Sequence, residues 1–164
     1  MAEPRQKPSK SRQDYQTPPE VLAAVRSLLR IDGFALDAAA SPENAVAPRY
    51  YTAEQDGKAH PWTRDGWTWL NPPFGDMNAW VKKAFLESIQ GKSSAVLVPA
   101  AVGSNWWRDW VDGRACVYFL NGRVTFVGCD APFPKDCALL VYAPSYVPEY
   151  RVWRWRKQIA AVAA

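Results

Sequence analysis

The 164-residue chain contains only one histidine, His60, and three cysteines, Cys116, Cys129 and Cys137. No two cysteines stand in a C-x-x-C spacing, so the sequence predicts neither a disulfide framework nor a zinc knuckle. A Ser-His-Asp or Cys-His catalytic arrangement would have to use the single histidine, which disfavours much hydrolase chemistry. We therefore expect no metal site and three cysteines that serve as small core residues.

Long apolar runs are also missing, because no run approaches the roughly 18 residues that a membrane span needs. Residues 1–7 lack the apolar core of a signal peptide. We therefore expect a soluble cytoplasmic protein with no membrane partner. Hydrophobic residues make up 48% of the chain and charged residues 22%, values that suit one globular domain.

Negative charge is in the minority: 20 Lys and Arg residues stand against 16 Asp and Glu residues, a net charge of +4. This mild basic excess is compatible with a polyanionic partner. Residues 1–13 are polar and carry spaced basic residues, which predicts a disordered basic arm. We expect residues 14–164 to form a single domain that includes a basic-aromatic C-terminal segment, 148–164.

Three helices are predicted. Thr17, followed by proline and by Glu20, has the pattern of a capping box with proline in the first turn, and apolar residues at helical spacing continue to residue 29. A second helix is expected over 77–89, ended by a glycine. Ser104 is a suitable cap for a short third helix that ends near residue 111.

Continuous apolar runs predict buried strands, at 34–37, 67–71, 95–99, 116–120 and 138–142, with a possible short strand at 124–126. Strands of this kind, separated by helices, indicate a doubly wound α/β domain with a mostly parallel sheet flanked by helices. Ligands bind beyond the carboxyl ends of the strands in such folds. Asp37 and Asn71 fall at two such ends.

The most informative segment is Asn71-Pro72-Pro73-Phe74, which directly follows a predicted strand. The prolines stiffen the backbone, so Asn71 Oδ1 and the Pro72 carbonyl can accept hydrogen bonds from one exocyclic amino group. Two such acceptors favour the pyramidal geometry that exposes the nitrogen lone pair. Phe74 offers a flat face for a base, a stacking contact of about 1–3 kcal/mol. The segment therefore suits direct methyl transfer to an amino nitrogen, with no covalent enzyme intermediate.

Asn-Pro-Pro-Phe resembles the (Asn/Asp/Ser)-Pro-Pro-(Tyr/Phe/Trp) signature of amino-methyltransferases that use S-adenosylmethionine. The wider set of motifs resembles the phage-type DNA N-6-adenine methyltransferase (Dam) family. Besides 71–74 with Trp80, the matching segments are 15–18, 36–40 with Asn44, 56–57 and 122–126.

The resemblance implies a compact Rossmann-like methyltransferase, with S-adenosylmethionine as cofactor, that acts on adenine N6 in double-stranded DNA, in a phage or prophage setting. Asn71, Pro72, Pro73 and Phe74 would hold and activate the adenine. The donor pocket would be formed by residues from the other motifs, namely Thr17, Asp37, Asn44 and Asp56. Thr17 would contact the methionine end of the donor and Asp56 its adenosyl portion.

A methyltransferase that acts within a duplex must bind phosphates and extrude its base. Arg123 follows a turn and is expected to contact phosphate or base. The C-terminal segment, a helix or an extension, would clamp the DNA backbone through Arg151, Trp153, Arg154, Trp155, Arg156 and Lys157.

Several alternatives remain open at this point. Asp37 follows Leu36 without the glycine-rich turn of larger methyltransferases, so the donor pocket must be built differently. Thr17 and Asp37 can be explained as helix or turn caps, and Trp69 and Trp80 as core. The same motif could serve a glutamine amide of a protein or an adenine of RNA, and an inactive DNA-binding protein would also keep the fold. The sequence does not predict the oligomeric state.

Overall fold

The computed structural model describes residues 15–157, so the predicted basic arm and the end of the C-terminal segment lie outside the described residues. The described part of the chain forms helices and strands in this order: α1 (Pro19–Leu29), β1 (Leu36–Asp37), β2 (Arg49–Tyr50), β3 (Trp67–Leu70), the 3₁₀ helix η2 (Phe74–Asp76), α2 (Met77–Ser88), β4 (Ser93–Pro99), α3 (Asn105–Trp110), β5 (Cys116–Leu120), β6 (Cys137–Tyr142) and β7 (Glu149–Trp153).

These strands form one seven-stranded sheet in the order β2-β1-β3-β4-β6-β5-β7. Every neighbouring pair is parallel except those of β6, which runs antiparallel between β4 and β5. The chain passes from β1 to β2 on one side and then returns to β3 on the other side. The strand order therefore reverses at the carboxyl ends of β1 and β3, where ligands bind in open α/β sheets.

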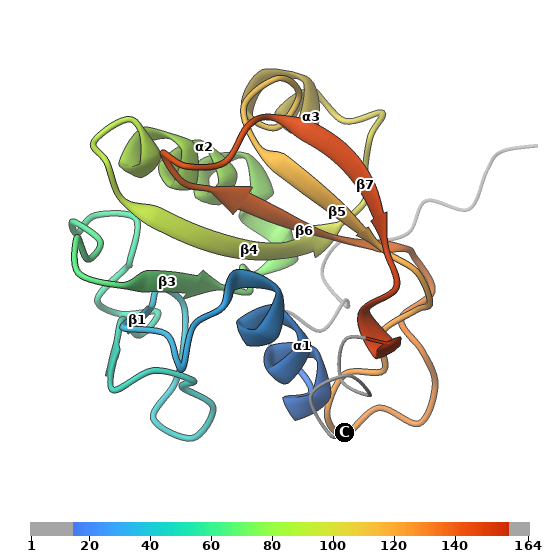
Figure 1. Cartoon of the computed structure of the whole chain (residues 1–164). Helices are drawn as coiled ribbons and strands as arrows, with labels where there is room; N and C mark the ends of the chain where they lie inside the picture. The colour runs from blue at the N-terminus through green and yellow to red at the C-terminus, as the bar shows by residue number, and fades with distance from the viewer. Residues whose placement is uncertain (1–14, 158–164) are drawn as a thin grey trace, which may run out of the picture.

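Helices cover both faces of the sheet, with α1 on one face and α2 and α3 on the other (Figure 1). The sequence of β4 is apolar over Ala95–Val98, and its packing explains why. Ala95 and Leu97 pack in the cluster that contains α1, whereas Val96 and Val98 pack in the cluster that contains α2 and α3. Side chains alternate between the faces of a strand, so a strand covered on both faces needs apolar residues throughout. The predicted doubly wound, mostly parallel arrangement is confirmed.

The start of α1 differs from the predicted capping box. Its N-cap is Pro18, whose carbonyl accepts from the backbone N–H groups of Val21 and Leu22, and no side chain caps this end. Thr17 therefore lies before the helix, and its hydroxyl is available for another partner. The prediction for α3 is confirmed, because Ser104 Oγ accepts a hydrogen bond from the Trp107 backbone N–H at 3.3 Å.

Three strand predictions need correction. The run over 34–37 pairs only at Leu36–Asp37, and residues 124–126 form no strand, although Val124 and Phe126 are buried. Residues 149–153 form β7, paired in parallel with β5, so the first part of the basic-aromatic segment is an edge strand of the sheet, and residues 155–157 are helical. Strand β2 has two residues without an apolar run, which is why its pattern gives no signal.

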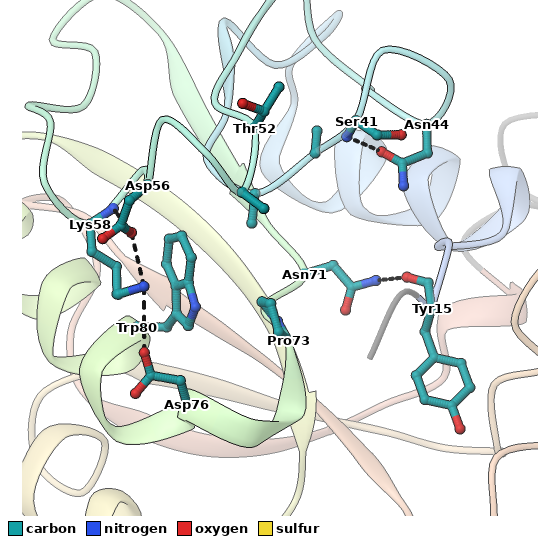
Figure 2. A pocket seen from close by; sticks show the side chains of 13 residues that line it. Tyr15, Ser41, Asn44, Thr52, Asp56, Lys58, Asn71, Pro73, Asp76 and Trp80 are labelled. Carbon is teal, nitrogen blue, oxygen red and sulfur yellow. Dashed lines mark hydrogen bonds and ion pairs between the residues drawn. The ribbon is translucent and has the colours of Figure 1, made fainter. Parts of the chain in front are cut away.

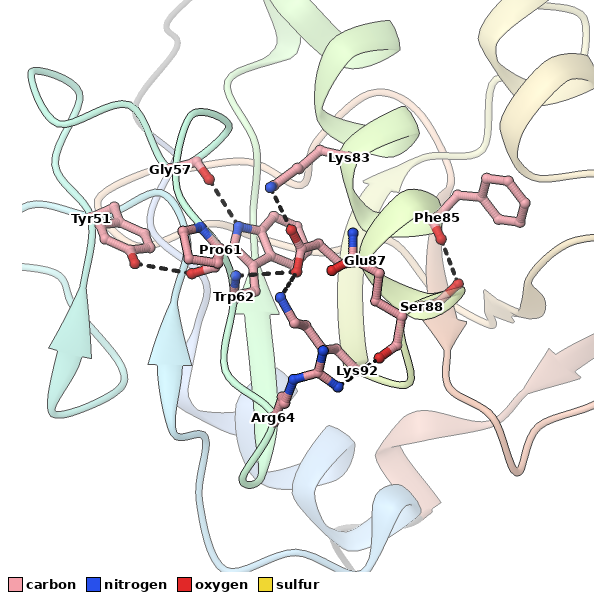
Figure 3. Close-up of polar contacts among 11 residues, drawn as sticks. Tyr51, Gly57, Pro61, Trp62, Arg64, Lys83, Phe85, Glu87, Ser88 and Lys92 are labelled. Atoms are coloured by element: carbon pink, nitrogen blue, oxygen red, sulfur yellow. Dashed lines mark hydrogen bonds and ion pairs between the residues drawn. The ribbon is translucent and has the colours of Figure 1, made fainter.

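The connections β1–β2 and β2–β3 carry no helix, and a buried ionic group holds the second of them in place (Figure 3). Glu87 on α2 is 4% exposed and accepts hydrogen bonds from Lys83, from Lys92 and, at 3.2 Å, from the Trp62 backbone N–H. Burial acts to raise the pKa of Glu87, but these hydrogen bonds outweigh it and hold the pKa below its ordinary value. The Trp62 indole N–H donates to the Gly57 carbonyl at 2.9 Å. The loop is therefore attached to α2 and β4.

Candidate active site

A cavity of about 530 Å³ opens at the carboxyl ends of β1 and β3, at the point where the strand order reverses. Its lining comes from the segments that follow the first three strands, 39–44, 52–58 and 71–80, together with Tyr15. The cavity lies within the size range of small-molecule sites, which runs from about 300 to 1,000 Å³. Asp37 and Asn71, the residues that the sequence predicts for the site, stand at these same strand ends.

Asn71 stands at the end of β3 and lines this cavity (Figure 2). Its amide nitrogen donates to the Tyr15 backbone carbonyl at 2.6 Å and to Thr17 Oγ1 at 3.0 Å. Both N–H groups of the amide are thus used on the protein side. The oxygen at the other end of the amide is therefore the group that Asn71 can present to a ligand.

The prolines and the aromatic residue of the motif take different positions. Pro72 is buried, whereas Pro73 lines the cavity and precedes η2. The Phe74 ring is half-buried and packs 5.3 Å from the Tyr15 ring and 5.4 Å from the Phe133 ring, measured between centroids. Phe74 is thus part of an aromatic cluster beside the cavity rather than of its lining. The Pro72 carbonyl as acceptor and Phe74 as stacking face stay predictions.

Asp37 ends β1 and is only 3% exposed. One carboxylate oxygen accepts from the Ala39 backbone N–H at 3.3 Å and the other from the Val46 backbone N–H at 3.1 Å. Burial raises the pKa of Asp37 to about 6, and the two hydrogen bonds oppose this rise. Asp37 lines a small polar cavity of about 30 Å³, shared with Thr17 and Asn71, next to the larger one.

Asn44 and Asp56 both line the larger cavity. Asn44 Oδ1 accepts from the Ser41 backbone N–H at 2.7 Å, which closes the turn after β1 and leaves the amide nitrogen on the cavity side (Figure 2). Asp56 follows β2, has a φ of +54° and pairs with Lys58 at 2.8 Å. The hydrogen bond from this ammonium group lowers the pKa of Asp56.

Residues that the sequence did not assign to the site complete the cavity. Lys58 Nζ lies 3.4 Å from Asp76 and 4.4 Å from the centre of the Trp80 ring (Figure 2). The far wall of the cavity therefore contains the face of an indole and a charged triad of Asp56, Lys58 and Asp76. Trp80 is 5% exposed, which agrees with its predicted core position, yet it also lines the cavity. Tyr15 belongs to the 15–18 segment on which the family resemblance rests. Lys58 and Asp76 belong to no such motif, so the sequence did not predict them.

The predicted DNA-contacting residues divide into exposed and buried ones. Trp153 and Trp155 are 6% and 3% exposed and pack in the core cluster of α1, so their indoles lie outside any surface available to DNA. Trp153 is the buried last residue of β7, whose other four residues are exposed. The arginine and lysine side chains are exposed, namely Arg123, Arg151, Arg154, Arg156 and Lys157.

Most of these exposed basic residues lie at the carboxyl ends of β5 and β7. Arg156 donates to the Arg123 backbone carbonyl at 3.2 Å, and the two residues sit beside Gly122. A Cβ at Gly122 would meet the Arg156 guanidinium at 2.1 Å, and its φ of +100° also favours glycine. Arg151 is the exception, since it lies within β7 and pairs with Glu149 at 2.9 Å.

Within residues 15–157 no three metal-binding side chains come together. No helix in this part of the chain is both long enough and apolar enough to cross a membrane.

Comparison with known proteins agrees with this geometry. Two phage proteins named DNA N-6-adenine-methyltransferase are related to the chain. The protein from Escherichia phage T1 is 30% identical over 118 residues, which cover 72% of this chain and 49% of the relative. The protein from Haemophilus phage HP1 is 27% identical over 96 residues, which cover 57% of this chain and 55% of the relative. The chain thus spans about half the length of these relatives.

A solved structure described as a class I S-adenosylmethionine-dependent methyltransferase, from Listeria monocytogenes, matches 90% of this chain and 69% of its own. The TM-score is 0.52 at 11% sequence identity, so this likeness shows the fold alone. The sequence profile of one family covers residues 5–150, which include every strand of the sheet up to the first residues of β7. The protein belongs to the DNA N-6-adenine-methyltransferase (Dam) family.

Proposed function

We propose that this protein transfers a methyl group from S-adenosylmethionine to the N6 amino group of an adenine flipped out of duplex DNA. The observation that carries the proposal is the Asn71 amide, whose nitrogen is engaged by the protein while its oxygen is left for the cavity. Family membership and the phage relatives support the same activity. A DNA substrate would place the enzyme in the cytoplasm of a bacterial or phage-infected cell.

The cavity suits the methyl donor in size and chemistry. Asp56, beyond β2, would accept hydrogen bonds from ribose hydroxyls, as an acidic residue does in related nucleotide-binding folds. The Trp80 indole offers an apolar wall for the adenine ring of the donor. Asp37 lines the small polar cavity next to it, where the amino-acid end would lie. When bound, the donor supplies a methyl group carried on a sulfonium sulfur.

Asn71 would act on the target adenine. The lone pair of N6 is delocalised into the purine ring, which makes this amino group a poor nucleophile. A hydrogen bond from N6–H to Asn71 Oδ1, with a second to the Pro72 carbonyl, would favour a pyramidal nitrogen with its lone pair exposed. Because Asn71 is fixed before the substrate arrives, these acceptors would act without reorganisation.

The DNA would approach the carboxyl ends of the strands. The exposed residues Arg123, Arg154, Arg156 and Lys157 belong to segments that follow β5 and β7 and so share this side of the sheet with Asn71. Such basic residues would contact phosphates and hold the duplex while the base is extruded.

The test measures methyl transfer from labelled S-adenosylmethionine to duplex DNA, with an RNA of matching sequence and cell protein as separate acceptors. We expect label on DNA, recovered as N6-methyladenine. Asn71→Ala should abolish transfer while the chain still folds, which far-UV circular dichroism checks. Asn105→Ala is a matched control, since Asn105 is an exposed residue of α3.

Label on RNA or protein alone would overturn the proposed substrate. Substantial turnover by Asn71→Ala would overturn the role of the amide even if DNA is the substrate.

A further inference from the structure

We propose that Thr17 is a positioning residue, which together with the Tyr15 backbone carbonyl fixes the Asn71 amide with its oxygen toward the cavity. The proposal rests on the function proposed above and changes the role of Thr17, which the sequence resemblance places on the methionine end of the donor. It begins with the two hydrogen bonds that Asn71 Nδ2 donates, at 2.6 Å and 3.0 Å.

The Tyr15 carbonyl determines which end of the amide faces it. A backbone carbonyl oxygen can only accept hydrogen bonds, so the NH₂ group of Asn71 must point toward it. The reversed amide would place two acceptor oxygens 2.6 Å apart. The orientation therefore follows from chemistry and does not depend on how the nitrogen and oxygen are assigned.

Thr17 supplies the second acceptor and completes the arrangement. An amide nitrogen carries two N–H groups, and the carbonyl takes one of them. The Thr17 hydroxyl accepts the other, at 3.0 Å. With both donors used, a flip of the amide would break two hydrogen bonds, so the oxygen is held on the cavity side.

The Tyr15–Thr17 segment is itself held from several directions. Thr17 is 5% exposed, and the helix after it is capped by the Pro18 carbonyl, which leaves the threonine hydroxyl to Asn71. The Gln16 carbonyl accepts from the Val127 backbone N–H at 3.1 Å. The Tyr15 ring packs 4.9 Å from the Phe126 ring. These contacts fix the two acceptors in place, although Thr17 is 54 residues away from Asn71 in sequence.

Loss of the hydroxyl should harm the reaction more than the binding of the donor. Without Thr17 Oγ1, one N–H of Asn71 loses its partner, and only the Tyr15 carbonyl still opposes rotation of the amide. A rotated amide presents its NH₂ group to the N6 amino group of the substrate, where two donors oppose each other. Leaving one buried donor unpaired corresponds to a rate loss of about 10- to 100-fold.

The experiment compares Thr17→Val, which keeps the shape without the hydroxyl, with Thr17→Ser, which keeps the hydroxyl. Glu20→Gln serves as control for the helix start, because Glu20 is exposed in the first turn of α1. For each variant, single-turnover methylation of duplex DNA, calorimetric S-adenosylmethionine affinity and melting temperature are measured.

We expect Thr17→Val to lower the single-turnover rate about 10- to 100-fold with donor affinity changed less than about twofold. Thr17→Ser should recover most of the rate, and Glu20→Gln should leave it unchanged. Thr17→Val with the wild-type rate, or with weakened donor binding as its main effect, would overturn the proposal. Should Thr17→Val fail to fold, the same comparison is made with Thr17→Ala.

A second readout is independent of activity. Both side-chain N–H resonances of Asn71, observed by NMR in ¹⁵N-labelled protein, should be protected from exchange in wild type and in Thr17→Ser, whereas in Thr17→Val the one that faces residue 17 should lose protection. Protection that is equal in all three would contradict the proposal even if the enzyme methylates DNA. An inactive wild type that shows the protection pattern would instead contradict only the proposed function.

Discussion

Asp37 shows how a single carboxyl group can serve a turn and a site at the same time. Each of its two oxygens accepts one backbone N–H, so the side chain holds the chain together after β1 while it lines the small polar cavity. Its position at a strand end follows from the sequence. Its Val46 partner, nine residues later, does not, because a loop without periodicity gives no sign of where it folds back.

The raised pKa of Asp37 leads to a prediction about pH and stability. Burial raises the pKa from 3.8 to about 6, so the folded state binds this proton more tightly than the unfolded state does. The stability that this carboxyl contributes is therefore complete below pH 3.8 and is lost as the pH rises through about 6, a change of about 3 kcal/mol. The measurement is urea unfolding of wild type and Asp37→Asn between about pH 2.8 and about pH 7, limits set about one unit outside this interval. The free energy of unfolding of wild type relative to the variant should fall with rising pH, and a constant difference would refute the assignment.

Residue patterns in the sequence predicted Asn71 but missed what orients it. A strand that ends in Asn-Pro-Pro-Phe is visible in a linear sequence. The contact between Asn71 and Thr17 is not, because it depends on where the segment before α1 crosses the end of β3. The same reason explains why Thr17 was read as a helix cap, since a threonine before prolines has that pattern whether or not its hydroxyl faces the helix.

Among the elements, the loop between β2 and β3 depends most on a few contacts. It has no helix of its own, and it carries Asp56 and Lys58 into the cavity wall. Gly57 allows it to lie against β1, since a Cβ at this position would meet the Ala38 carbonyl oxygen at 2.0 Å. The buried Glu87 group then attaches its far end to α2 and β4 (Figure 3).

Removal of the Glu87 carboxylate should be strongly destabilising. Lys92 is 5% exposed, so Glu87→Ala would leave a buried ammonium group without its partner, at a cost of about 3–5 kcal/mol. Asp109→Ala is the control, because its pair with Arg108 is exposed and such pairs contribute little to stability. The measurement is the free energy of unfolding in urea. If Glu87→Ala and Asp109→Ala lower the free energy of unfolding by the same small amount, the buried Glu87 group does not hold the loop.

Gly57→Ala tests the same loop from the donor side. The methyl group would push the loop away from Ala38, and the wall that carries Asp56 would move with it. We expect weaker binding of S-adenosylmethionine in calorimetry, with little change for Gly103→Ala, where a Cβ meets nothing within 4 Å. Unchanged donor affinity in Gly57→Ala would separate this wall from donor binding.

The sequence predicts the strands that are buried on both faces and misses the others. Strands β4, β5 and β6 are apolar, apart from two serines at the start of β4, because both faces of the sheet are covered, and their sequence shows it. The two-residue strand β2 and the exposed edge strand β7 have no such signature, so pairing with neighbours alone defines them. The antiparallel direction of β6 was also hidden, since a buried strand has the same composition in either direction.

At the scale of the whole molecule, the exposed basic residues after β5 and β7 should make the affinity for DNA depend on salt concentration. Each phosphate contact that is removed lowers the slope of log affinity against log salt by about 1. The double variant Arg154→Gln and Lys157→Gln should therefore reduce this slope by about 2 and weaken binding to all sequences alike. Arg30→Gln is the control, because Arg30 ends α1 just before the chain turns into β1, away from the carboxyl ends of the strands.

Binding is measured by fluorescence anisotropy over a salt series. A slope that does not change in the double variant would remove these residues from the DNA surface. Point substitutions are needed, since a deletion of residues 151–164 would also remove the buried Trp153 and Trp155 and so unfold the sheet edge.

Strand β6 has one more consequence. Because it runs against its neighbours, the β5–β6 connection over residues 121–136 leaves the sheet and returns to it on the same side as Asn71. Its exposed residues 130–132 and 134–136 can change in composition without shifting a strand, whereas Phe126 and Phe133 pack against Tyr15 in the segment that orients Asn71. Enzymes built on this plan could therefore diverge at these exposed residues while inheriting the reaction centre intact.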